Sequence, residues 1–305
     1  MKYYNLKKLI VFGWVGFLFL LSSCEDVVKI EVKDGKQQLV VDAWLTNEAK
    51  EQKIVLTYSQ PYFDDTDLMP ALGAEVTVIL DNSRILKFSD ENSDGVYTFT
   101  PQDGDYMGDA KQIRLLVKLG DEQYQSFSAL KRVPTIDSVA YEEFSFPVEI
   151  PDAGPKDGFL AEFYANDLPG EGDTYLIRSY KNDSLRFKPE NITLAYDAGF
   201  SAGSKTDGLM FILPIRQSIN PVLFQDKDKL KVELLSIPIE AYYYIIQLRQ
   251  ESQNGGIFAT PSSNIPTNVF NINPKSENTA LGAFIVSRVS SFETVIDKKK
   301  AKPKK

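Results

Sequence analysis

The chain has 305 residues, of which 43% are hydrophobic and 12% aromatic, so it is long and apolar enough for about two domains with real cores. It has no histidine and a single cysteine, which excludes Ser-His-Asp triads, Cys-His pairs, His-ligated metals and disulfide bonds. The net charge of −8 falls to −16 (25 basic and 41 acidic residues) without the lysines of residues 1–23 and the residues after Ile296. A protein with this negative charge repels phosphate backbones, so nucleic acid is not expected as a partner.

Residues 1–23 have the layout of a secretory signal peptide. Three lysines precede an uncharged run at residues 9–21, which is shorter than the roughly 20 residues that span a bilayer. The sequence Leu21-Ser22-Ser23-Cys24 resembles a bacterial lipobox, in which the cysteine sulfur is acylated and the cysteine becomes the first residue of the mature chain. We therefore predict lipidation of Cys24 and a tether at residues 24–36. The alternative is an ordinary signal peptide that leaves an unmodified cysteine.

Residues 37–133 alternate between apolar and polar side chains, which is typical of strands with one buried face. About seven short strands in roughly 100 residues favour an immunoglobulin-like or transthyretin-like β-sandwich. The predicted strands are residues 39–45, 54–58, 76–80, 85–88, 96–100, 113–119 and 124–129.

The longest loop of this predicted sandwich, residues 61–72, carries the candidate ligand-binding residues. Aromatic side chains supply contact area and carboxylates capture a cationic group, and such sites tend to lie on loops held by a rigid scaffold. The candidates are Tyr62, Phe63, Asp64, Asp65 and Asp67. A solvated acidic loop tip is the alternative.

Residues 134–296 are predicted to form a second β-rich domain with less regular strands and one helix. We expect strands at residues 136–146, 159–165, 175–180, 209–213, 230–235 and 284–289. A helix is expected near residues 238–253, because Pro238 suits its start and Asn254-Gly255-Gly256 its end. Its predicted buried stripe is Ala241, Tyr244, Ile245 and Leu248, widened by Tyr242 and Tyr243. A ligand-stacking platform is the alternative for the tyrosines.

The fold class is thus mainly β, with two tandem sandwich-like domains and one packed helix in the C-terminal domain. Residues 297–305 form a lysine-rich tail that we expect to be disordered, since blocks of like charge usually stay unfolded. Contact of this tail with anionic lipid head groups or polysaccharide is the other reading.

Two sequence patterns could indicate a metal site or a catalytic pair, and neither is complete. Asp90, Asn92, Asp94 and Gly95 match the first half of a calcium loop, but Pro101 stands where its bidentate glutamate belongs, which favours a hairpin turn. Glu142 and Glu143 are adjacent on a predicted strand and so point to opposite faces, which a glycosidase pair cannot do. We predict no catalytic residue, no metal and no cofactor.

Several separated motifs resemble the domain of unknown function 4249 family, lipoproteins of Bacteroidota, over nearly the whole mature chain. They are the acidic Glu25-Asp26 after Cys24, Leu39-Val40-Val41-Asp42-Ala43-Trp44-Leu45, Ser59-Gln60-Pro61-Tyr62-Phe63, Gly95-Val96-Tyr97, Val133-Pro134-Thr135-Ile136-Asp137-Ser138, Ile239-Glu240-Ala241-Tyr242, Gly256-Ile257-Phe258 with Pro261, and Leu281-Gly282-Ala283-Phe284 with Ser287. The resemblance carries no catalytic residues. It implies an outer-membrane lipoprotein, often encoded beside a TonB-dependent transporter, and the acidic start resembles a surface-export signal.

We therefore expect a non-enzymatic lipoprotein, anchored to outer-membrane lipid through Cys24 and facing the cell surface, that assists a TonB-dependent transporter or binds its ligand. A structural or adhesive envelope protein is the alternative, because sandwich modules in series also suffice for that role. A carboxylate-based glycan hydrolase is the third hypothesis.

Overall fold

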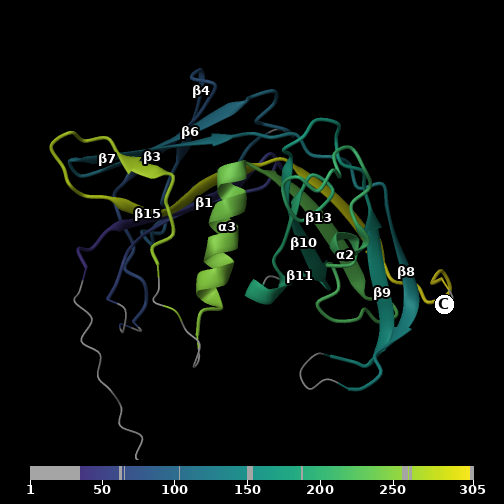
Figure 1. Cartoon of the computed structure of the whole chain (residues 1–305). Coiled ribbons are helices and arrows are strands. Elements are labelled where there is room, and N and C mark those ends of the chain that lie inside the picture. Colours follow the sequence, from purple (N-terminus) through teal and green to yellow (C-terminus); the bar gives the residue numbers. More distant parts are fainter. Residues whose placement is uncertain are drawn as a thin grey trace, which may run out of the picture. The chain divides into compact units, whose positions relative to one another are not determined.

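Two β-sheets that pack face to face form the first part of this computed structural model, which describes residues 35–61, 64, 66–102, 104–149, 154–186, 188–255, 260 and 263–302 (Figure 1). Sheet I has the strand order β15-β1-β2-β5, and sheet II has the order β14-β7-β6-β3-β4. The strands of sheet I are β1 (Leu39–Thr46), β2 (Gln52–Tyr58), β5 (Val96–Phe99) and β15 (Ala280–Ser287). Those of sheet II are β3 (Glu75–Leu80), β4 (Arg84–Phe88), β6 (Gln112–Leu119), β7 (Glu122–Ala129) and β14 (Val269–Asn271).

The alternating pattern of the sequence is the cause of this sandwich. In β1, Leu39, Val41, Ala43 and Leu45 are at most 2% exposed and join the core between the sheets, while the residues between them point the other way. The seven strands predicted between residues 37 and 133 are all present, with ends that differ by one or two residues. The structure is mainly β, as predicted.

The boundary predicted at residue 133 needs correction, because the C-terminal part of the chain completes both sheets. Strand β15 pairs in parallel with β1, from Leu39 opposite Ala280 to Thr46 opposite Ser287, and β14 pairs with β7. Figure 1 shows β15 beside β1. Val269, Ala280, Phe284 and Val286 belong to the first core. Local periodicity gave no sign of this, because it does not say which strands pair.

Sheet III lies in the second part of the chain and has the order β11-β10-β13-β16, with β12 also paired to β10. Its strands are β10 (Thr174–Lys181), β11 (Ser184–Leu185), β12 (Thr193–Tyr196), β13 (Lys229–Ile237) and β16 (Val289–Val295). The hairpin β8 (Ser138–Ser145) and β9 (Asp157–Tyr164), with the short helix α2 (Leu213–Arg216), shares a second core with one face of this sheet. A 3₁₀ turn, η1, covers Pro189–Asn191.

The strand predicted at residues 209–213 is wrong. This stretch makes one isolated bridge, between Met210 and Asn166, and then enters α2. Pro214 in the first turn explains the change, since proline fixes a helical φ and has no N–H to give to a strand.

Helix α3 (Ile239–Ser252) confirms the predicted helix, with Pro238 at its N-cap. Its buried side chains are Ala241, Tyr242 and Ile245, whereas Leu248 is 42% and Tyr243 is 52% exposed, so those two assignments to the buried stripe are wrong. The helix packs into a third core that also takes Leu176 and Leu235 of sheet III and Ile285 of sheet I. The described helices include none that is long and apolar enough to cross a membrane.

The tail predicted to be disordered is ordered as far as Lys302. The N–H of Lys302 donates to the carbonyl of Tyr141 (2.9 Å), and the carbonyl of Lys302 accepts from Glu143 (3.3 Å), so the tail extends the β8 edge. Ala301 packs on the second core. These backbone bonds offset the repulsion among the lysines.

Candidate functional site

Most of the predicted site residues lie outside the described part of the chain. Cys24, Tyr62, Phe63 and Asp65 are among these. Asp64 and Asp67 are described, and both are exposed. The same loop also exposes the apolar side chains of Leu68, Met69 and Leu72, which the sequence reasoning did not single out. The recognition loop at residues 61–72 therefore stays a prediction, with more apolar surface than expected.

The incomplete calcium motif forms a turn. The carboxylate of Asp90 accepts the backbone N–H groups of Asp94 (3.2 Å) and Gly95 (3.0 Å), and the carboxylate of Asp94 accepts that of Val96 (3.0 Å). These oxygens therefore stabilise backbone instead of converging on a cation. Among the described residues, no group of three or more Asp, Glu, Cys or His side chains is arranged to hold a metal.

Glu142 and Glu143 line two different hollows, one with Glu162 and Tyr164 and the other with Phe144 and Asp157. The register of β8 and β9 places Glu162 opposite Ala140, on the same face as Glu142. Sequence spacing could not find this pair, because it arises from the hairpin. Glu162 is held at 2.6 Å by Arg216, so its carboxylate is engaged in an ion pair at the edge of this hollow.

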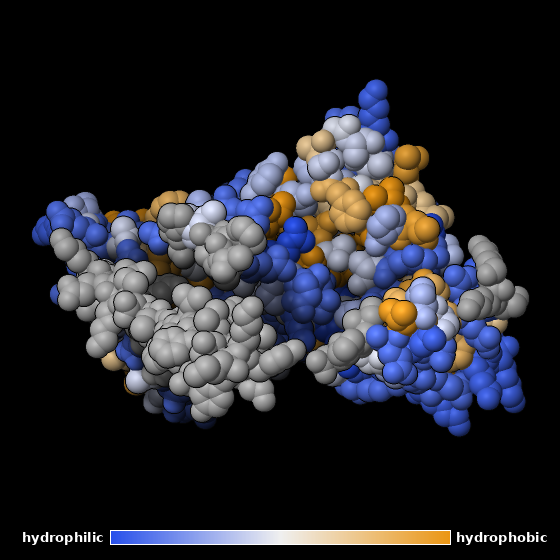
Figure 2. All heavy atoms as spheres, turned by 60° about the horizontal axis from the view of Figure 1, so that its bottom comes forward, coloured by the Kyte–Doolittle hydropathy of each residue, from blue (hydrophilic) through white to orange (hydrophobic). Residues whose placement is uncertain are grey.

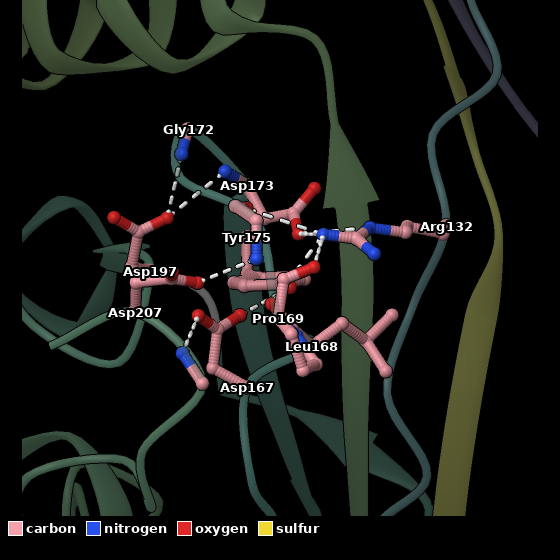
Figure 3. Close-up of polar contacts among 11 residues, drawn as sticks. Arg132, Asp167, Leu168, Pro169, Gly172, Asp173, Tyr175, Asp197 and Asp207 are labelled. Atoms are coloured by element: carbon pink, nitrogen blue, oxygen red, sulfur yellow. Dashed lines mark hydrogen bonds and ion pairs between the residues drawn. The ribbon is translucent and has the colours of Figure 1, made fainter.

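Figure 3 shows a second set of carboxylates, which converge at the start of β10. The carboxylate of Asp167 accepts the O–H of Tyr175 (2.6 Å) and the N–H of Gly208 (3.1 Å). That of Asp197 accepts the N–H groups of Gly172 (2.8 Å) and Asp173 (3.0 Å). Burial raises the pKa of Asp167, and burial together with the bond to Asp167 raises the pKa of Tyr175.

Arg132 ties this network to the segment that leads into residue 133. Its guanidinium pairs with Asp173 (2.6 Å), which raises the pKa of Arg132, and it donates to the carbonyls of Pro169 (2.7 Å) and Gly170 (3.2 Å). Asp167, Asp173 and Asp197 are at most 8% exposed, and each accepts hydrogen bonds from these donors on at least one carboxylate oxygen. The network therefore stabilises the loops that contain Gly172 and Gly208.

The most suitable place for a ligand is a groove along α3. Two adjoining hollows of about 150 and 210 Å³ share Glu240, Ala241 and Asn268. The first extends toward Tyr243 and Gln247 of α3, and the second toward the half-exposed Phe127 of β7. We call these two hollows the α3 groove.

The floor of the α3 groove is held by the backbone of β15. Asn268 donates to the carbonyl of Phe284 (2.8 Å) and accepts its N–H (2.9 Å), and the hydroxyl of Thr267 donates to the carbonyl of Gly282 (2.8 Å). Burial raises the pKa of the neighbouring Tyr244, with a smaller effect from the charge of Asp42.

The exposed side chains of the α3 groove include Tyr243, which is 52% exposed, Glu240 and Gln247. An exposed ring beside a carboxylate and an amide on a rigid floor can bind a small molecule. The sequence pattern missed this site because it assigned Tyr243 to the buried stripe.

Exposed apolar side chains also gather elsewhere. On the face shown in Figure 2, hydrophobic residues reach the surface in separate patches with hydrophilic residues between them. Phe200, Leu209 and Met210, from the loop before α2, and Leu213, the first residue of α2, are each 46 to 55% exposed. Such patches are candidate contacts with another protein.

Comparison with known families gives one match. The model of a domain of unknown function, DUF4249, matches residues 25–293, which is most of the chain and agrees with the resemblance seen in the separated motifs. No curated protein matches the chain.

Proposed function

The chain belongs to the DUF4249 family, and from this premise we propose that it is a lipid-anchored lipoprotein of the outer membrane that assists a TonB-dependent transporter by holding a ligand or the transporter itself. In this proposal the protein is not an enzyme and faces the cell surface. The observation that carries the proposal is the position of Cys24, the single cysteine, directly behind an export segment. Several acyl chains on one cysteine give an effectively stable anchor.

The α3 groove supports the ligand-holding part of the proposal. It combines an exposed tyrosine ring with a free carboxylate and amide, and it lies on elements fixed by two cores. The patch around Met210 supports a contact with a protein partner.

Replacement of Cys24 tests the anchor. Cys24→Ala should abolish palmitate incorporation and release the protein from membranes washed at high salt, because no other thiol is present to be acylated. The double variant Glu25→Gln and Asp26→Asn is the matched comparison: it should keep the label but lose protease sensitivity on intact cells. Equal labelling of Cys24→Ala and the natural protein would remove the basis of the proposal.

Co-purification and uptake test the role. The tagged natural protein should recover an outer-membrane TonB-dependent transporter, and its deletion should reduce uptake by that transporter. Tyr243→Ala should weaken uptake by roughly tenfold if the ring contacts the ligand. Leu248→Ala, also exposed on α3 but outside the groove, should not. Lost surface attachment with unchanged uptake would instead indicate a structural or adhesive protein. Turnover of a glycan that depends on one Asp or Glu would indicate a hydrolase.

A further inference from the structure

Four exposed lysines gather at the end of β16, and this cluster contrasts with the rest of the chain. Lys298, Lys299 and Lys300 follow β16 directly, and Lys227 lies beside them, lining the same concavity of about 660 Å³. We call these four residues the lysine cluster. The body of the chain without residues 1–23 and 297–305 has a net charge of −16, so the cluster is a local reversal of sign.

Backbone contacts hold the lysine cluster in place. The N–H of Lys227 donates to the carbonyl of Ile296 (2.7 Å), and the N–H of Lys300 donates to that of Asp297 (2.8 Å). The N–H and carbonyl of Lys302 then bind the edge of β8, and Figure 1 shows the C-terminal segment beside that strand. The ammonium groups are therefore presented by a fixed turn, not by a freely moving tail.

The carboxylates near the cluster are already engaged. Asp226 accepts the backbone N–H of Lys298 (2.9 Å), and Asp297 accepts that of Lys299 (3.0 Å). Asp228 pairs with Lys181 (2.9 Å), and Glu293 pairs with Lys229 (3.1 Å). Within the described residues, none of the four cluster lysines forms an ion pair. Their charge remains available to an external anion.

We propose that the lysine cluster is a binding surface for the phosphate groups of anionic lipids and orients the protein on a membrane. Lysine is a compact point charge suited to phosphate, and basic clusters of this size bind anionic lipid surfaces. This inference does not depend on acylation of Cys24.

The orientation of the protein on the membrane follows from the negative charge of the chain outside the lysine cluster. Screening limits electrostatic contact to about 8 Å at physiological ionic strength, so only the face that touches the membrane matters. An acidic face in that position would be repelled, while the lysine cluster with the half-exposed Val295 beside it would be attracted. A single orientation is thereby favoured.

Vesicle co-sedimentation tests the proposal with the full chain carrying Cys24→Ala, which cannot be acylated. The probes are vesicles of phosphatidylglycerol with phosphatidylcholine, compared with phosphatidylcholine alone. Any contribution of residues 1–23 is the same for every variant. The test variant is Lys298→Gln with Lys299→Gln and Lys300→Gln, and the matched control is Lys87→Gln with Lys111→Gln and Lys118→Gln, three exposed lysines of sheet II and its border.

The test variant should lose binding to the anionic vesicles by about a hundredfold, since each lysine near such a surface contributes roughly fivefold. The control, which changes the net charge equally, should bind as the starting protein does. Raised salt should weaken binding of the starting protein. Equal loss in both triple variants, or an equal loss from phosphatidylcholine vesicles in the test variant, overturns the proposal. The test variant and the control variant should unfold at the same temperature, because the side chains of the lysine cluster make no bond that holds the fold.

Discussion

At the scale of single residues, the buried polar side chains stabilise loops by satisfying backbone donors. Asp167 and Asp197 accept N–H groups from turns that would otherwise be buried without partners. The energetic importance of such groups lies in the cost of leaving a partner unsatisfied, which exceeds the net gain from one hydrogen bond.

Tyr175→Phe tests this network. The change removes the O–H that donates to Asp167 at 2.6 Å and leaves a buried carboxylate with one donor fewer. We expect the free energy of unfolding to fall by about 1–3 kcal/mol in urea titrations. Tyr243→Phe, at an exposed ring, is the matched control and should change it by less than about 0.5 kcal/mol. Equal effects would contradict the network's role.

The hydrogen bonds of Glu122 predict that the stability of the protein depends on pH. Its carboxylate accepts from Ser276 (2.6 Å), Asn271 (2.7 Å) and Asn278 (2.7 Å), and these bonds lower its pKa, that of Ser276 most. Because the folded pKa lies below the unfolded one, the stabilisation is present above the usual glutamate pKa and is lost as the pH falls through the folded value.

Hydrogen exchange of the β14 amides measures this effect. Protection should decrease on acidification in the natural protein, and Glu122→Gln should lack that change because the group no longer titrates. Glu91→Gln, at an exposed turn, is the control and should retain it. An NMR titration that places the Glu122 pKa at or above the usual value would contradict the prediction.

At the scale of elements, the register of α3 decides which side chains reach the core. Ile245 is 3% exposed in the third core, whereas Leu248, on the predicted stripe, is 42% exposed. The i, i+3, i+4 rule finds a helix, but the neighbours of the helix decide how wide its buried face is.

Two alanine substitutions separate these positions. Ile245→Ala should lower the free energy of unfolding by about 2–5 kcal/mol, because it leaves a cavity. Leu248→Ala should change it by less than about 0.5 kcal/mol. Denaturant titration of the two variants checks this, and similar losses would show that the helix is rotated from the position described.

The pairing of β15 with β1 depends on a glycine. Gly282 has φ +85°, and a Cβ at this position would overlap the carbonyl oxygen of Val41, the residue opposite it. Gly282→Ala should therefore destabilise the protein by about 3 kcal/mol or more. Gly104→Ala, where a Cβ would meet open space, should be nearly neutral by the same thermal denaturation measurement. A neutral Gly282→Ala would argue against this pairing.

At the scale of the whole molecule, one continuous stretch of the chain contributes a strand to each of two sheets. Strand β15 belongs to sheet I and β16 to sheet III, with Arg288 alone between them. The N–H and the carbonyl of Arg288 bond with Ser236 of β13, which fixes the crossing point. Sheet I is therefore completed by β15, which lies more than 150 residues after the other strands of that sheet.

A fragment of residues 25–133 should not fold by itself. It would lack β14 and β15, expose the edges of β1 and β7, and lose Phe284 and Val286 from its core. We expect no cooperative thermal transition by near-ultraviolet circular dichroism, and recovery when a fragment of residues 263–302 is supplied. A cooperative transition of the first fragment alone would restore the boundary at residue 133.

Local patterns were enough to predict the β class, the seven strands between residues 37 and 133 and the helix at α3, since periodicity and a proline at a helix start act over a few residues. They also pointed to the family through motifs such as Leu39 to Leu45. The lipidation of Cys24 stays a prediction.

The sequence by itself determined that the chain is mainly β and where most of the strands and the helix α3 lie, because those burial patterns are set by neighbouring residues. Only the tertiary structure decided that β15 completes sheet I, that Tyr243 faces a groove, and that Lys227 joins Lys298 to Lys300. These features depend on backbone and core contacts between residues far apart in the chain, and no local pattern encodes which distant partner a strand or side chain meets.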